Sequence, residues 1–173
     1  MAVLLDASQL QAALARMAAE IARLLRPACP GALVGIRRRG DVLAERLAKI
    51  LARDHGRNDL PLGALDITLY RDDLAEIGPN AVVRQTFIDF PVADKTVVLV
   101  DDVLYTGRTI RAALTSIADL GRPACVRLAV LCDRPGRELP IQADIWALRL
   151  EPVRGQVVVR LKETDGVDEV TSE

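Results

Sequence analysis

The chain has 173 residues, 23 of them basic and 24 acidic, which gives a formal net charge of −1. Half of the residues are hydrophobic but only 3% are aromatic, so a core built from them is mainly aliphatic. This length suits one domain over residues 1–173, and the composition excludes a disordered chain, a collagen-like repeat, a disulfide-stabilised miniprotein and a protein that coats nucleic acid without specificity.

The first part of the chain alternates between helical and strand patterns. Apolar residues recur at helical spacing in two segments and form short runs in two others. These patterns predict a helix at 8–26, a strand at 32–36, a helix at 42–51 and a strand at 65–69. Ser8 and Asp41 are the expected N-terminal caps of the two helices.

Residues 72–94 interrupt this alternation with glycine, asparagine and prolines, and we expect them to form a long excursion or loose hairpin. Irregular connections of this length in a compact domain are usually functional lids or disordered segments. The regular patterns then return and predict a strand at 96–100, a helix at 110–120, strands at 126–131, 144–148 and 157–161, and an acidic tail at 163–173.

The order of these elements predicts an α/β fold with a mostly parallel central sheet flanked by helices, because parallel strands are joined by right-handed crossovers. Ligands of such folds bind beyond the carboxyl ends of the strands. We therefore expect the site among the loops 37–40, 101–109 and 133–139.

The segment 97–109 carries the clearest chemical signal. An apolar, β-branched run leads directly into Asp101 and Asp102, and a turn with a glycine and two threonines follows before the next helix. Burying unpaired carboxylates costs several kcal/mol, so this pair should face solvent, a cation or ligand hydroxyls. The turn offers free N–H groups at a helix N-terminus, which suits a phosphate. Together they describe a receptor for a ribose 5-phosphate.

Other ligand sites and mechanisms find less support in the sequence. It holds neither a P-loop nor a dinucleotide-binding glycine pattern. A receiver domain also carries strand-end aspartates, but not this glycine-hydroxyl turn, and a charged turn at a helix start explains the acidic pair alone. His55 lies in a polar stretch and is expected to be solvated.

Features of the cysteines and the N-terminus favour a cytoplasmic protein. Cys29, Cys125 and Cys132 form no CxxC pair, which indicates reduced thiols rather than a zinc site or disulfides. The N-terminus lacks the basic region of a signal peptide, and no apolar run is long enough for a membrane helix.

The segment DDVLYTGRT at 101–109 closely resembles the phosphoribosyl diphosphate (PRPP) signature of type I phosphoribosyltransferases. With LDITLYRDD before it at 65–73 and DRPGRELPI after it at 133–141, it is similar to the PyrR family. That family combines attenuation of pyrimidine operons with uracil phosphoribosyltransferase activity. The resemblance implies the type I phosphoribosyltransferase fold with a flexible hood at 72–94, a Mg²⁺ cofactor, and a homodimer or higher homo-oligomer.

The resemblance also implies roles for individual residues. Asp101 and Asp102 would hold the ribose hydroxyls and lie in the second shell of a Mg²⁺ carried by PRPP. The 5-phosphate would lie in the turn formed by Val103, Leu104, Tyr105, Thr106, Gly107, Arg108 and Thr109. Arg38, Arg39 and Gly40 match the pyrophosphate loop, although the family usually has threonine in place of Arg38. Asp101, Asp102 and Arg39 would be the catalytic group.

The resemblance also assigns residues of this chain to the hood and to the base site. Arg71, Asp72 and Arg84 would belong to a hood that closes over the site, although an exposed loop charge explains Arg84 as well. Arg134 matches a substrate-contacting position, and the backbone near Val157 would read the base. The expected reaction joins uracil to PRPP and gives UMP and pyrophosphate.

Two alternatives stay open: an RNA-binding attenuator of the pyr mRNA leader with vestigial activity, and a phosphoribosyltransferase for another base. Residues 1–57 carry a net charge of +5, which suits phosphate. RNA-binding members of the family tend to have Thr-Arg-x-x-His where this chain has 15–19, Arg-Gly-His-Arg at 134–137, and arginine at Gln142. Because these donors are missing together, the sequence favours the enzyme, with UMP-dependent regulation as an additional role.

Overall fold

The computed structural model describes residues 2–25, 30–72, 85–151 and 155–172. A five-stranded parallel sheet with the order β3-β2-β4-β5-β6 forms its centre. Its strands are β2 (Gly31–Ile36), β3 (Leu62–Leu65), β4 (Thr96–Leu104), β5 (Cys125–Asp133) and β6 (Ile145–Arg149). The expected α/β fold with a parallel central sheet is confirmed.

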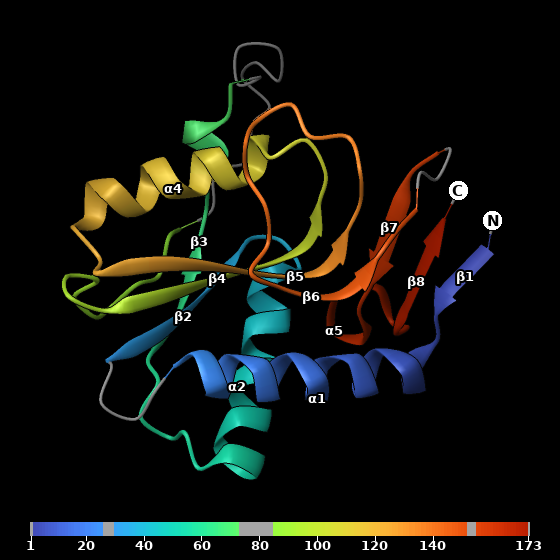
Figure 1. Cartoon of the computed structure of the whole chain (residues 1–173), viewed down its shortest axis with the longest axis horizontal. Helices are drawn as coiled ribbons and strands as arrows, with labels where there is room; N and C mark the ends of the chain where they lie inside the picture. Colours follow the sequence, from blue (N-terminus) through green and yellow to red (C-terminus); the bar gives the residue numbers. More distant parts are fainter. Residues whose placement is uncertain (1, 26–29, 73–84, 152–154, 173) are drawn as a thin grey trace.

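Helices cover both faces of this sheet (Figure 1). On one face lie α1 (Ala7–Leu24) and α2 (Gly40–His55), and on the other lies α4 (Arg108–Leu120). Each face has its own core of aliphatic side chains, such as Leu14, Leu47 and Val98 on the first and Leu99 and Ile117 on the second. None of the helices in the described ranges is long and apolar enough to cross a membrane.

Strand β4 is longer than its apolar run predicts. The residues from Thr96 to Val100 are buried, as expected for a central strand with helices on both faces. Pairing with β5 nevertheless continues to Leu104, which lies opposite Asp133. Asp101 and Asp102 are therefore held inside the strand ladder, and α4 begins at Arg108 rather than at 110.

Both predicted helix caps are wrong. Asp6 caps α1 in place of Ser8, because Asp6 and Gln9 form a capping box in which each side chain accepts the other residue's backbone N–H. Helix α2 begins at Gly40 without a side-chain cap, and Asp41 lies inside its first turn.

The strand predicted at 65–69 lies three residues earlier, at β3. The Asp66 carboxylate accepts hydrogen bonds from the backbone N–H and the hydroxyl of Thr68 at 2.7 and 2.5 Å. This local turn ends the strand and begins a short 3₁₀ helix, η1 (Thr68–Tyr70). Beyond it, most of the predicted hood (73–84) lies outside the described residues, and its returning end forms one bridge between Ala64 and Phe87.

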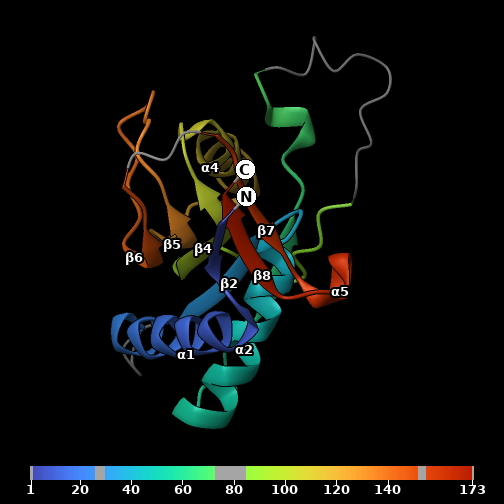
Figure 2. The same ribbon diagram turned by 90° about the vertical axis from the view of Figure 1, so that its right-hand side faces the viewer.

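The acidic tail predicted at 163–173 is regular structure. A second, antiparallel sheet has the order β1-β8-β7 and consists of β1 (Ala2–Leu5), β7 (Val157–Arg160) and β8 (Glu169–Ser172). The turn of α5 (Lys162–Asp165) connects its last two strands. Figure 2 shows both chain ends together on this small sheet, next to the central one. The small sheet places β7 beside the carboxyl end of β4.

Candidate functional site

A pocket of about 290 Å³ opens where β4, the loop before α2, and β7 meet. It lies at the carboxyl edge of the central sheet, where the strand order predicts a ligand. Six of the predicted site residues line it: Arg39, Asp102, Val103, Tyr105, Arg134 and Val157. Residues that the sequence places in three separate loops thus meet at one site.

Asp102 of the acidic pair lines this pocket, and Asp101 precedes it in β4. Asp101 is 4% exposed, and Asp102 is half-buried. Each carboxylate accepts the backbone N–H of the following residue, at 3.0 and 2.7 Å, and neither forms an ion pair with any described residue. Burial raises the pKa of Asp102, against the opposing charge of Arg39, and burial together with the charge of Asp102 raises that of Asp101 well above its ordinary value.

The loop before α2 packs directly against this pair. A side chain at Gly40 would meet the Val100 carbonyl oxygen at 2.4 Å, so glycine is needed for the close approach. The peptide bond between Arg37 and Arg38 is cis. Arg39 has a φ of 66° and lines the pocket, while the Arg38 side chain is exposed and lies outside the lining.

The turn after β4 leaves backbone N–H groups available at the start of α4. Gly107 adopts a φ of 93° and precedes the first helical residue. The Thr106 hydroxyl accepts from the Arg108 N–H at 3.3 Å, and the Thr106 carbonyl accepts from Glu138 N–H at 3.0 Å. The first N–H groups of a helix have no intrahelical partner, so the turn up to Thr109 suits an anion.

An aromatic ring and a guanidinium group form the outer wall. The guanidinium carbon of Arg134 lies 4.0 Å from the centre of the Tyr105 ring. A side chain at Gly136 would meet that ring at 2.2 Å, so this glycine keeps the ring in place. Tyr105 follows β4 and Arg134 follows β5, so the stacked pair connects the loops after these two strands.

The hood residues are only partly described. Asp72 forms ion pairs with Arg108 and, at 3.9 Å, with Arg111. These pairs connect the start of the hood with the first turn of α4. Arg71 is exposed, and Arg84 lies outside the described residues.

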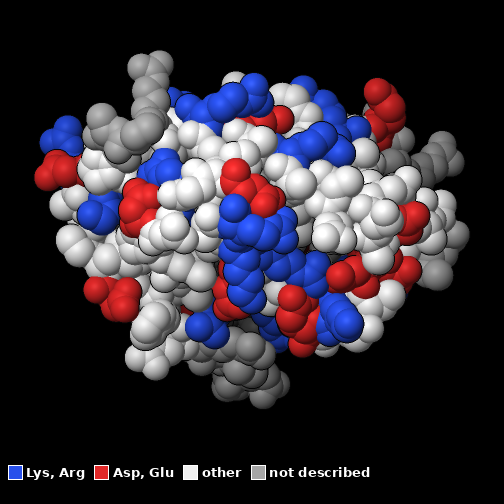
Figure 3. Space-filling model, turned by 90° about the horizontal axis from the view of Figure 1, so that it is seen from below, with Lys and Arg blue, Asp and Glu red and all other residues white. Residues whose placement is uncertain are grey.

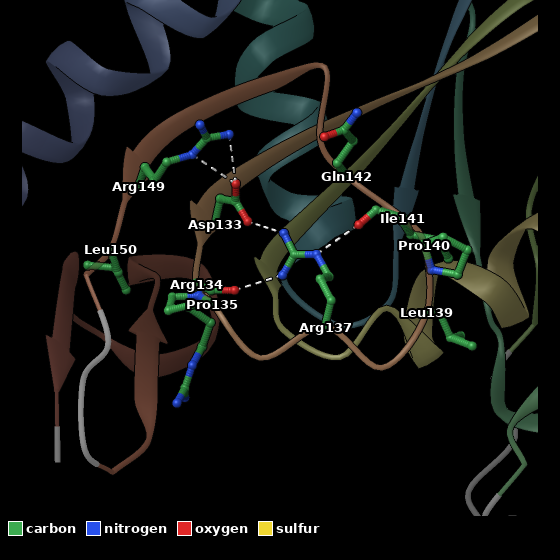
Figure 4. A pocket seen from close by; sticks show the side chains of 10 residues that line it. All are labelled: Asp133, Arg134, Pro135, Arg137, Leu139, Pro140, Ile141, Gln142, Arg149 and Leu150. Carbon is green, nitrogen blue, oxygen red and sulfur yellow. Dashed lines mark hydrogen bonds and ion pairs between the residues drawn. The ribbon is translucent and has the colours of Figure 1, made fainter.

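A larger pocket of about 650 Å³ lies on the other side of Arg134 (Figure 4). Here Asp133 accepts hydrogen bonds from Arg137 and Arg149, and Arg137 also donates to the carbonyl oxygens of Leu104 and Tyr105. In Figure 4 the Arg134 side chain points away from Arg137. Arg137 therefore supports the turn after β4, and Arg134 is the arginine shared by the two pockets.

Sequence reasoning missed residues of the site: Val158 and Val159 also line the pocket, next to the predicted Val157, and two others come from different positions. Gln156 lines the smaller pocket just before β7, and Asp165 accepts a hydrogen bond from Arg39 at 3.3 Å. Gln156 could have been found from its place before a predicted strand. Asp165 could not have been found, because its segment was predicted to be an acidic tail.

Other titratable groups play no visible part in this pocket. His55 is exposed at the end of α2, outside the lining. Burial, with the charge of Asp102, raises the pKa of Cys132 to about 12, so this thiol stays protonated at neutral pH. Within the described ranges, no cluster of three or more His, Cys, Asp or Glu could hold a metal ion by itself.

Comparison with known proteins places the chain in a family. The phosphoribosyl transferase domain matches residues 3–164. The bifunctional protein PyrR of Chloroflexus aurantiacus is 54% identical over 168 residues, which cover 96% of this chain and 92% of the relative. The bifunctional protein PyrR of Deinococcus deserti is 51% identical over 170 residues, covering 98% and 92%.

Solved structures agree on the fold. A hypoxanthine-guanine phosphoribosyltransferase from Bacillus anthracis superposes with a TM-score of 0.76 at 17% identity, over all of this chain and 98% of the other. A purine phosphoribosyltransferase from Pyrococcus horikoshii gives a TM-score of 0.64 at 26% identity, over 85% and 86%. By its domain match and its full-length relatives, this chain belongs to the PyrR family of type I phosphoribosyltransferases.

Proposed function

We propose that this protein is a uracil phosphoribosyltransferase, which converts uracil and PRPP to UMP and pyrophosphate. The observation that carries the proposal is the pair of Asp101, which is buried, and Asp102, which is half-buried: neither forms an ion pair with a described residue, and both border a turn with available N–H groups. Such an unpaired pair is costly without a ligand. Ribose hydroxyls and a phosphate are the ligand groups that satisfy both halves of the site.

The sugar phosphate is held from two sides. Asp101 and Asp102 accept hydrogen bonds from the ribose 2′- and 3′-hydroxyls. The 5-phosphate lies in the turn from Leu104 to Thr109, where the hydroxyls of Thr106 and Thr109 add to the backbone donors. Arg108 is engaged by Asp72 and Glu138, so closure of the hood acts on the same turn.

The leaving pyrophosphate faces the loop of Arg38, Arg39 and Gly40. The Arg39 guanidinium stabilises the negative charge that grows as the glycosidic bond to pyrophosphate breaks. The donor set fits Mg²⁺ carried by the substrate, because the two strand-end carboxylates are hard oxygen ligands but too few to hold an ion alone. When bound, Mg²⁺ supplies further neutralisation of the pyrophosphate charge.

The base is read by main-chain groups of β7 near Val157, opposite the Tyr105 and Arg134 stack. The direct test is to incubate the protein with PRPP and either uracil, guanine or hypoxanthine and to measure nucleotide formation. We expect UMP from uracil and little product from the purines. Preferential formation of a purine nucleotide would show that the base assignment is wrong while the sugar site stands.

A second role, UMP-dependent binding of the pyr mRNA leader, is favoured by the relatives that are named bifunctional. Arg16 and Arg23 of α1 are exposed, as a contact to phosphates requires. Figure 3 shows Lys and Arg side chains gathered on the face seen from below, with acidic side chains among them. A mixed face of this kind predicts weaker RNA binding than a continuous basic surface.

The RNA role is tested by an electrophoretic mobility shift with the leader RNA, with and without UMP, at two salt concentrations. Binding that needs UMP and weakens steeply with salt supports it. Binding with neither property contradicts it and leaves the enzyme as the sole function.

A further inference from the structure

The turn of α5 contacts the first half of α2 through two arginines. Arg46 forms ion pairs with Glu163 and Asp168, and Arg39 pairs with Asp165. Positions 39 and 46 are seven residues apart, so they lie on one side of the helix and its N-terminal cap. Figures 1 and 2 show α5 next to the sheet-facing end of α2.

The two arginines differ in what else surrounds them. Arg46 is a structural anchor: its side chain is 17% exposed and has two carboxylate partners. Arg39 lines the pocket beside Asp102, and its buried Nε has no hydrogen-bond partner within the described part of the chain. Among the described residues, one carboxylate pairs with its guanidinium, that of Asp165 at 3.3 Å.

Asp165 is itself held rigidly. One of its oxygens accepts from the Leu161 N–H at 2.9 Å and from the Thr164 hydroxyl at 2.7 Å, and the other accepts from Arg39. The Leu161 N–H, the Thr164 hydroxyl and Arg39 together lower the pKa of Asp165 to about 2. The carboxylate is therefore charged at every pH at which the enzyme works, and it offers Arg39 a fixed anchor.

We propose that Asp165 is a positioning residue for pyrophosphate: it holds the Arg39 guanidinium at the pocket so that Arg39 meets the diphosphate of PRPP without reorganising. This inference rests on the proposed function for the role of Arg39. The small sheet would then have two roles. Its strand β7 forms a wall of the base site, and Asp165 in its α5 turn helps to bind the leaving pyrophosphate. Prior orientation of a charged group reduces the cost of ordering it on binding.

The substitution Asp165→Asn separates positioning from folding. The asparagine oxygen can still accept from Leu161 and Thr164, so the turn of α5 is kept, while the amide turns its N–H groups toward Arg39 and cannot pair with it. Glu163→Gln is the matched control. It changes a carboxylate two residues away that is half exposed, and Arg46 keeps Asp168.

The experiment measures calorimetric binding of inorganic pyrophosphate with Mg²⁺, binding of UMP, and KM for PRPP. For Asp165→Asn we expect pyrophosphate Kd and PRPP KM to rise five- to twentyfold, with UMP affinity within twofold of wild type, because UMP carries no diphosphate. Glu163→Gln should leave all three within twofold. In an Arg39→Ala background, Asp165→Asn should add less than twofold, since it acts through Arg39.

Each result decides something different. Unchanged pyrophosphate binding in Asp165→Asn overturns the positioning role, and so does an equal loss for UMP or an equal loss in Glu163→Gln. Wild-type protein that binds pyrophosphate but forms no UMP contradicts the uracil activity, while the comparison of the variants still tests Asp165. Wild-type protein that binds no pyrophosphate overturns both the assignment of Arg39 and the role of Asp165.

Discussion

Two buried aspartates lie in the carboxyl-terminal halves of neighbouring strands of the central sheet, and their surroundings are opposite. Asp133 of β5 is 6% exposed and is paired with Arg137 and Arg149. Asp101 of β4 is 4% exposed, has Asp102 as its neighbour, and pairs with no cation among the described residues. The strands are adjacent and parallel, with Asp101 opposite Val130, so the two aspartates are offset by three residues along the same edge of the sheet.

This difference distinguishes a structural carboxylate from a functional one. A carboxylate neutralised within the protein stabilises its own surroundings, as Asp133 does for the turn after β4 through Arg137. A buried pair of carboxylates that lacks such partners lowers stability unless a ligand satisfies it. Folding stability alone therefore does not explain why unpaired carboxylates lie at positions 101 and 102.

The largest expected effect is on catalysis by Asp102→Asn. Loss of an acceptor for a ribose hydroxyl should lower kcat/KM for PRPP by about 10²–10³-fold, the size seen when one preorganised polar contact to a transition state is removed. The melting temperature should stay equal or rise, because a buried charge is removed. Initial rates and thermal unfolding measure both; near-normal turnover would contradict the assignment of this carboxylate to ribose.

The matched change in the paired carboxylate, Asp133→Asn, should act on stability instead. It removes charged hydrogen bonds to two arginines and should lower the free energy of unfolding by about 2–3 kcal/mol. The folded variant should keep kcat/KM within about threefold of wild type. Urea denaturation measures the loss of stability, and steady-state rates measure kcat/KM. If activity fell as far as in Asp102→Asn, the distinction between the two aspartates would be lost.

A smaller effect concerns pH. Because the pKa of Asp101 is raised in the folded state, the folded protein binds this proton more readily than the unfolded chain does. Through this group, stability therefore rises as the pH falls from neutral toward the unfolded pKa of about 4. The free energy of unfolding of Asp101→Asn should exceed that of wild type at pH 7, and this difference should be smaller at pH 5. Urea denaturation at both pH values measures it. A difference of the same size at pH 7 and pH 5 would contradict the unpaired state of Asp101.

The smallest expected effect is that of Tyr105→Leu. It removes the ring beneath Arg134, and an exposed cation–π pair contributes about 0.5–1 kcal/mol. The KM for uracil should rise about two- to fivefold with little change in kcat. Steady-state kinetics at saturating PRPP would show it, and an unchanged KM would mean that the stack does not shape the base site.

Much of the fold and part of the site follow from local signals. The apolar run before Asp101 and the glycine turn after it are contiguous in sequence, so the strand β4, the helix α4 and the turn between them could be predicted together. The end of β3 was misplaced because the Asp66 turn outweighs the β-propensity of the residues around Ile67.

The small sheet could not be predicted for a different reason. Its strands β1 and β8 are four residues each, and β8 lies between β7, which precedes it in the chain, and β1, which lies at the opposite end of the sequence. Composition marks 163–173 as acidic and polar, which is equally typical of a solvated tail. The pairing of Asp165 with Arg39 joins residues 126 positions apart and leaves no local pattern.

The placement of β8 in the middle of its sheet affects how the protein is made. Among the described strands, β7 has β8 as its one hydrogen-bonded neighbour, so this wall of the smaller pocket lacks its strand pairing until residues 169–172 are in place. A nascent chain that has already exposed residues 104–109 outside the ribosome thus still lacks the β7–β8 pairing on the opposite wall of the pocket.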